Sequence, residues 1–325
     1  MFARSTRIIL ALTVLLTATL GSACAAGPSA SPAFLRPPSR IVLPERLLVR
    51  SGGKIISVDL ESYVVDTILS EVSPTTESDA VAAAIFEVQA VVARTYAVSR
   101  AGRHRDEGFD LCDSTHCQIY QPARRQSSRF SAAAMQAVQR TRAMILAYDA
   151  RPIEALFHAD CGGATASADA VWGGAAVPYL RASVDDLPEP THRQWRVTAK
   201  ADQIRKALNL DQRTAVGARL ESIAIASRDA SGRASGLTLH GERSLNVRGD
   251  ILRAVLNRTL GDRAVQSTLF TIQRQGSDYV FTGTGFGHGV GLCQRGAASR
   301  LRRGDSVEDV LRAYYTGART TRGLN

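Results

Sequence analysis

Aromatic residues are scarce in this sequence, and sulfur-containing residues are scarcer still. Only 6% of the 325 residues are Phe, Trp or Tyr, and the chain holds 2 Trp, 3 Met and 5 Cys. Hydrophobic residues nevertheless make up 45% of the chain, and charged residues of both signs make up 22%. A chain of this length and composition can bury at least one large core, which excludes an intrinsically disordered protein.

Nucleotide-binding and nucleic-acid-binding motifs are also missing. The glycine-rich segment GTGFGHGVGLCQRGA, residues 283–297, has neither the G-x-G-x-x-G spacing nor the terminal Lys-Ser/Thr of a phosphate-binding loop. The formal net charge is +10, but most basic residues stand singly rather than in a dense block. We therefore expect no organic cofactor and no nucleic-acid partner. Anionic cell-wall polymers or membrane surfaces suit the positive charge better.

A hydrophobic run stands at the N-terminus. Two arginines precede an apolar stretch over residues 8–20, and small residues follow over residues 21–26. This order predicts a secretory signal peptide over residues 1–25, with a short membrane anchor as the alternative. Cys24 adds the alternative of a lipoprotein. The chain is therefore expected to be exported, to the periplasm or the cell-envelope surface.

The rest of the chain divides into a linker and one folded domain. Residues 26–45 are rich in Pro, Ser and Ala and predict a linker, and residues 46–325 predict the domain. Helices are predicted at about 80–100, 131–142, 250–260 and 307–315, and hairpins over 46–60, 143–159 and 221–242. Strands and helices alternate without a regular βαβ rhythm. The expected fold is α+β, with mostly antiparallel strands and a few packed helices around a substrate cleft.

The segment LCDSTHCQ offers candidate metal ligands, because Cys112, His116 and Cys117 stand within six positions. Two thiolates and an imidazole are normal zinc ligands, and a fourth could be water or Cys161. The alternative is a disulfide, which export favours. A nucleophilic pair of His288 and Cys293 is a weaker hypothesis, since catalytic Cys and His residues usually come from separate segments.

Several segments together resemble one family. The glycine segment is similar to the G-x-G-H-G-V-G-[ML]-S-Q-x-G-A signature of the SpoIID/LytB family of sporulation and cell-wall proteins. Further segments that resemble the family, in its order, are YVVDTILSEV (63–72), VQAVVARTYAVS (88–99), DSTHCQIYQP (113–122) and the block from ALFHADCGG to RASVDD (155–186). The resemblance runs from about residue 46 to the C-terminus.

This resemblance implies that the domain over residues 46–325 is catalytic, a peptidoglycan lytic transglycosylase. Such enzymes cleave glycan strands between N-acetylmuramic acid and N-acetylglucosamine and leave a 1,6-anhydro end. The family's catalytic glutamate corresponds to Glu71, which would act first as acid and then as base; Glu77 and Glu87 are nearby alternatives. The other function that the family suggests is a non-catalytic wall-binding enhancer of an N-acetylmuramoyl-L-alanine amidase.

The resemblance also implies roles for other side chains. The residues expected to bind substrate are Arg94, Tyr96, His158, His288 and Gln294. For Arg94 and Tyr96 the alternative is to hold their helix to its neighbours, and for His288 it is a structural turn. Trp172 and Tyr179 are expected either to stack on sugar rings or to lie in the core.

The resemblance bears on the four cysteines too. Some family members hold zinc at the segment that corresponds to Cys112, His116 and Cys117. Cys161 and Cys293 stand where relatives generally have Ser or another small residue, which suggests that the two meet as a disulfide.

Overall fold

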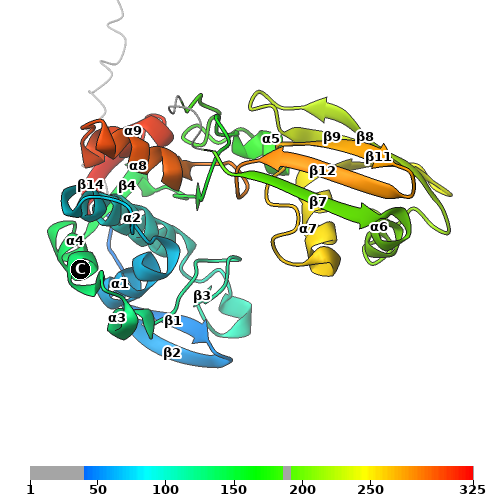
Figure 1. Ribbon diagram of the computed structural model, residues 1–325. Helices are drawn as coiled ribbons and strands as arrows, with labels where there is room; N and C mark the ends of the chain where they lie inside the picture. Colours follow the sequence, from blue (N-terminus) through cyan, green and yellow to red (C-terminus); the bar gives the residue numbers. More distant parts are fainter. Residues whose placement is uncertain (1–39, 186–191, 325) are drawn as a thin grey trace, which may run out of the picture. The chain divides into compact units, whose positions relative to one another are not determined.

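The structure is a computed structural model and describes residues 40–185 and 192–324 (Figure 1). The predicted signal peptide and most of the predicted linker lie outside the described residues. The end of the linker prediction is wrong, because Leu43 is only 3% exposed and packs in the core. Its main-chain N–H donates to the carbonyl oxygen of Leu324 at 2.7 Å, so the start and end of the folded part lie together.

The first element is the predicted hairpin. β1 (Arg46–Ser51) and β2 (Lys54–Asp59) pair antiparallel around Gly52 and Gly53, which both have positive φ. Glycine adopts such angles at no steric cost, so these two residues fix the turn. β3 (Leu111–Cys112) pairs in parallel with the other edge of β1.

Three helices form one layer beside this small sheet. They are α1 (Leu60–Glu71), α2 (Asp79–Arg100) and α4 (Ser131–Arg140), and the Ser78 side chain caps α2. α2 is long and apolar enough to cross a membrane, but 67% of its most apolar stretch is buried inside the protein. It is therefore best described as a core helix.

The remaining elements complete three hydrophobic clusters. The short elements up to residue 172 are the 3-10 helix η1 (Arg105–Glu107), α3 (Arg124–Ser127), β4 (Met144–Tyr148), β5 (Arg151–Pro152), β6 (Phe157–His158) and α5 (Ala168–Trp172). Residues 194–284 form β7 (Gln194–Lys200), α6 (Ala201–Leu208), β8 (Leu220–Arg228), β9 (Ala234–Gly241), β10 (Leu245–Arg248), α7 (Gly249–Leu260), β11 (Phe270–Gln275) and β12 (Asp278–Thr284). These strands make two antiparallel sheets, β10-β9-β8 and β11-β12-β7, around a cluster of their own.

The chain then returns to its first half. β13 (Leu292–Cys293) pairs in parallel with β6, so that Cys293 lies opposite His158. α8 (Gln294–Arg302), α9 (Val307–Tyr314) and β14 (Arg319–Arg322) follow, and β14 pairs with β4. The described residues thus have the predicted α+β fold with mostly antiparallel pairing (Figure 1). The glycine loop, residues 283–291, connects β12 to β13.

Candidate functional site

Glu71 ends α1, and its carboxyl group contacts the segment that follows β3. The main-chain N–H of Ile119 donates to Oε1 of Glu71 at 2.7 Å. The residue is half-buried, and burial raises the pKa of its carboxyl from 4.5 to about 7, although the Ile119 hydrogen bond acts in the opposite direction. A carboxyl group with this pKa keeps its proton in a large fraction of molecules near neutral pH, as a general acid must.

Glu71 differs from the other two carboxyl groups that point from α1 into the protein. Glu61 is paired with Arg94 at 2.5 Å, and Asp66 is paired with Arg125 at 2.7 Å. Within the described part of the chain, Glu71 makes no ion pair, and no cation contributes to its pKa. Among the acidic residues of α1, it is the one without a guanidinium partner in the described part of the chain.

The two alternative glutamates are ion-paired. Glu77 accepts from Arg302 of α8 at 3.0 Å, and Glu87 accepts from Arg140 of α4 at 2.5 Å. Each of these carboxylates is occupied by an arginine of another helix, whereas the Glu71 carboxyl has no such partner among the described residues. The structure therefore favours Glu71 among the three candidates.

Arg94 and Tyr96 hold α2 in place rather than facing a substrate. Arg94 has no exposed surface; besides Glu61, its guanidinium donates to the main-chain oxygen of Met144 at 3.1 Å. Tyr96 is only 3% exposed and packs in the first hydrophobic cluster. Neither residue offers surface that a glycan could touch in this structure, which argues against substrate binding by Arg94 and Tyr96. Their alternative role, packing between helices, fits the contacts.

His288 stands in the glycine loop between two other rings. Its ring centroid lies 5.3 Å from that of Trp172 and 5.5 Å from that of His158. Nδ1 accepts from the main-chain N–H of Val290 at 3.0 Å, and the ring also hydrogen-bonds the backbone of Phe157. These contacts with main-chain groups favour the structural role for His288, which is half-buried.

The charge state of His288 follows from its surroundings. Burial, together with the charges of Arg253 and Arg233, lowers its pKa from 6.5 to about 3. The imidazole is neutral at physiological pH. His158, whose ring lies 5.5 Å from that of His288, has only 4% of its surface exposed, which argues against the predicted contact of His158 with substrate.

The glycines of the loop are required by protein side chains that lie against the backbone. Gly287 has φ of 115°, and an added Cβ would come within 2.7 Å of Cβ of His158. A Cβ at Gly289 would overlap the guanidinium of Arg233. Here the close approach is made by the protein itself.

Gln294 and two aromatic residues complete the predicted set. Nε2 of Gln294, the first residue of α8, donates to Oε1 of Gln89 on α2 at 3.3 Å, which joins two segments of the family pattern. Trp172 is 36% exposed and offers a ring face at the surface. Tyr179 is half-buried; with Tyr148, Asp149, Arg151 and Pro152 it lines a surface hollow of about 500 Å³.

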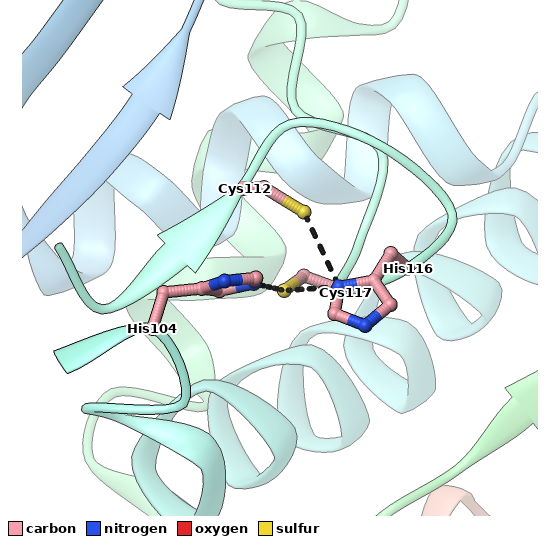
Figure 2. A group of neighbouring side chains, drawn as sticks. All are labelled: His104, Cys112, His116 and Cys117. Carbon is pink, nitrogen blue, oxygen red and sulfur yellow. Dashed lines mark hydrogen bonds between the residues drawn. The ribbon is translucent and has the colours of Figure 1, made fainter. Parts of the chain in front are cut away.

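Four side chains converge at the end of β3 (Figure 2). The ligand atoms of His104, Cys112, His116 and Cys117 all lie within 4.8 Å of one another. Sγ of Cys117 lies 3.4 Å from Nε2 of His104, and Sγ of Cys112 lies 3.8 Å from Nδ1 of His116. Tetrahedral Zn²⁺ with ligands at about 2.0–2.3 Å places its donor atoms about 3.3–3.8 Å apart, so the four residues fit this metal.

Of the two fourth ligands that the sequence allows, water and Cys161, Cys161 lies in a separate buried group with Asp185 and Cys293. The fourth side chain in the group of Cys112, His116 and Cys117 is His104. Nδ1 of His104 lies 2.5 Å from Oε1 of Glu107, and donation to this carboxylate leaves Nε2 free to face the thiols. His104 stands eight positions before Cys112, which is not a recognised spacing of zinc ligands. Only the folded turn that contains η1 shows that His104 lies beside the other three side chains.

Cys161 and Cys293 meet in the core. Both have no exposed surface, and the main-chain N–H of Cys161 donates to Sγ of Cys293 at 3.2 Å. Both thiols are free in the structure, so the proximity part of the hypothesis holds and the covalent bond stays a prediction.

We expect these two thiols to form a disulfide when the purified chain is treated with oxidised glutathione. The bond would form as the two cysteine thiols lose two hydrogens to oxidised glutathione, whose disulfide is reduced to two thiols. Because the bond closes a loop of more than 100 residues, it should stabilise the fold by up to about 4–5 kcal/mol. Non-reducing peptide mapping should find the Cys161–Cys293 peptide; recovery of both residues as free thiols would refute the prediction.

The chain is similar to known sporulation and cell-wall proteins. A profile described as SpoIID, stage II sporulation protein, matches residues 50–148, and one described as a domain of unknown function (DUF8618) matches residues 188–291. An uncharacterised protein of Brachyspira hyodysenteriae is 30% identical over 261 residues, which cover 80% of this chain and 66% of that protein. Stage II sporulation protein D of Bacillus subtilis is 28% identical over 82% of this chain and 76% of its own length. The amidase enhancer of Bacillus subtilis is 27% identical over 73% of this chain but only 38% of its own length.

Proposed function

Because this chain belongs to the SpoIID/LytB family of cell-wall proteins, we propose that it is a peptidoglycan lytic transglycosylase with Glu71 as its single acid and base. The observation that carries the proposal is the environment of Glu71. Its carboxyl is half-buried, has no cationic partner among the described residues, and has a pKa of about 7.

One carboxyl group is enough for this reaction. Protonated Glu71 gives its proton to the glycosidic oxygen, and the bond from that oxygen to the anomeric carbon of the muramyl unit breaks. The resulting carboxylate then takes the proton from the 6-hydroxyl of the same sugar, whose oxygen bonds to the anomeric carbon. The 1,6-anhydro ring is formed and Glu71 is protonated again. A hydrolase would need a second carboxylate to activate water or to act as nucleophile.

The pKa of Glu71 suits both halves of this cycle. A carboxyl group with a pKa far below 7 would rarely hold the proton for the first step. One with a pKa far above 7 would be a poor proton donor to the glycosidic oxygen. Ile119 supports the second half, because its N–H stabilises the carboxylate that exists between the two proton transfers.

We expect the raised pKa of Glu71 to appear as a pH dependence of stability. The folded-state pKa of about 7 lies above the unfolded value of 4.5, so the folded state binds the extra proton between these pH values. This stabilisation is complete below pH 4.5 and is lost as the pH rises through 7. Glu71→Gln has no such group, so the variant should gain about 1–3 kcal/mol relative to wild type between pH 5 and 8.

Urea unfolding of both proteins at each pH measures this difference. The comparison between variant and wild type cancels the titration of all other groups. A stability difference that does not change with pH would show that Glu71 titrates normally.

We further propose that His104, Cys112, His116 and Cys117 hold one structural Zn²⁺, as the donor set and spacing fit (Figure 2). When bound, the ion would cross-link the η1 turn and the loop after β3. Metal binding through Nδ1 of His116 leaves a hydrogen on Nε2, so the exposed Arg103, now 3.2 Å from Nε2, has to turn away. Cys117 stands two residues before Ile119, so this cross-link would fix the N–H that holds Glu71.

A second function is favoured by the likeness to the amidase enhancer. In that case the chain would bind peptidoglycan and assist a cell-wall amidase without cleaving glycan itself. The two functions differ in one measurable product, the anhydromuramyl end.

A further inference from the structure

We propose that the glycine loop carries a binding site for the carboxylate group of a muramic acid residue, formed by Arg253 and Arg233 behind the rings of Trp172 and His288. The choice of a sugar carboxylate rests on the proposed action on peptidoglycan. The site itself rests on the contacts of the two arginines and on the two rings.

Arg233 is a buried guanidinium with free donors. It is 1% exposed, and Nη2 donates to the main-chain oxygen of Cys161 at 2.5 Å. Its Nε and Nη1 groups have no hydrogen-bond partner. Buried guanidinium donors are almost always satisfied, because an unpaired one costs its full desolvation energy. Oδ1 of Asp229 accepts from the main-chain N–H of Arg233 at 3.0 Å, but neither Asp229 nor Asp160 makes an ion pair with its guanidinium.

Arg253 adds a second positive charge. It projects from α7 and is half-buried, and Nε donates to the main-chain oxygen of Val265 at 3.0 Å. Across the described ranges it makes no ion pair, and after burial itself the charge of Arg233 is what lowers its pKa. Asp229 and Asp160 offset part of the charge of Arg233 without pairing with its guanidinium, so the two neighbouring guanidinium groups can still bind a further anion.

The rings place these charges beside an accessible surface. Both arginines act on the imidazole of His288, which contacts the ring of Trp172 at a centroid distance of 5.3 Å. Trp172 is 36% exposed, and its helix α5 packs against α7, which carries Arg253. An aromatic face next to a guanidinium suits a sugar ring that bears a carboxylate.

N-acetylmuramic acid has both parts, whereas N-acetylglucosamine has the ring without the carboxylate. Phosphate has the charge without the ring. These three compounds therefore separate a muramyl site from a plain sugar site and from a plain anion site.

The test is a titration of the full chain with each compound, followed by NMR chemical shifts or calorimetry. We expect N-acetylmuramic acid to bind at least about tenfold more tightly than either of the other two. Arg253→Gln should weaken this binding about tenfold or more, while Arg243→Gln, which removes the same charge at an exposed position, should change it less than about twofold. Trp172→Ala is the second variant, because Arg233 is too deeply buried to be replaced safely.

Unchanged binding by Arg253→Gln, equal binding of phosphate, or no binding at all would overturn the proposal. If no compound binds, the free donors of Arg233 are hydrogen-bonded by a solvent molecule instead. The measurement needs no turnover, so it is independent of the proposed activity. Loss of anhydro products with intact N-acetylmuramic acid binding would refute the transglycosylase and leave this site standing.

Discussion

Glu71→Gln is expected to lower the formation of 1,6-anhydromuramyl ends by about 10²–10⁴-fold or more. Glutamine has the same shape and can keep the hydrogen bond from Ile119, but it has no proton to give to the glycosidic oxygen and cannot take one from the 6-hydroxyl. Because the same group serves both steps, its loss should affect the whole cycle. Digestion of purified glycan strands, with separation of the products by mass, measures the effect.

Matched controls are available on neighbouring segments. Glu77→Gln and Glu87→Gln remove carboxyl groups that are paired with Arg302 and Arg140, and they should leave the product yield within a few-fold of wild type. Glu71→Asp keeps an acid but withdraws it by one methylene, so partial activity is expected. If wild type makes no anhydromuramyl ends, or if Glu71→Gln makes as many, the assignment of Glu71 is wrong.

The enhancer function gives a different pattern. The chain would then yield no anhydromuramyl ends alone but would raise the rate of a cell-wall amidase on intact peptidoglycan. Glu71→Gln would leave this increase unchanged, because no proton transfer by the chain is involved. Adding wild type and Glu71→Gln to the same amidase assay separates the two functions.

Locally determined features were predictable from the sequence. The β1–β2 hairpin follows from two adjacent glycines that accept positive φ, and α2 follows from its apolar period and the Ser78 cap. The structure has the same elements at nearly the same bounds. Such features depend on a few neighbouring residues, and for this reason a single sequence contains them.

Features that depend on distant segments were not predictable in the same way. Arg94 looked able to bind a glycan, but Glu61, 33 positions earlier, neutralises it inside the core. The glycine loop looked open to a ligand, but His158 and Arg233 fill the space that the missing side chains leave. Both outcomes depend on burial and on pairing between distant segments. Neither burial nor such pairing can be recognised in the local sequence pattern.

The candidate site was predictable from the sequence only in part. The position of Glu71 came from a family resemblance, and the structure adds what the resemblance lacked, a half-buried carboxyl without a cation among the described residues. Of the four side chains of the proposed zinc site, three were predictable because they stand within six positions, whereas His104 joins the group only through the η1 turn.

Removal of the metal ligand His104 is expected to have the second largest effect. In the proposed zinc site, His104→Ala takes away one of four ligands and the contact with Glu107 that orients it. Structural zinc contributes about 10–16 kcal/mol in small zinc fingers; here a large core shares the stabilisation, so we expect a loss of about 3–5 kcal/mol. This corresponds to a fall in Tm of about 10 °C.

The measurement combines metal analysis with thermal unfolding. Freshly purified wild type should carry about one Zn²⁺ per chain, and His104→Ala should carry much less. His240→Ala is the matched control, because His240 is exposed and its ring hydrogen-bonds the hydroxyl of Ser244, away from the proposed zinc site. Wild type treated with a chelator should behave like His104→Ala. If freshly purified wild type contains no zinc and the chelator does not change its Tm, the metal proposal is wrong.

Activity extends this test to Glu71. Cys117 is two residues from Ile119, and Gln118 between them accepts from the hydroxyl of Tyr63 at 3.2 Å. If zinc fixes this segment, its removal frees the N–H that Ile119 gives to Glu71, and the carboxylate between the two proton transfers loses a donor. The folded, zinc-free protein should therefore form anhydromuramyl ends more slowly, and added Zn²⁺ should restore the rate in wild type but not in His104→Ala.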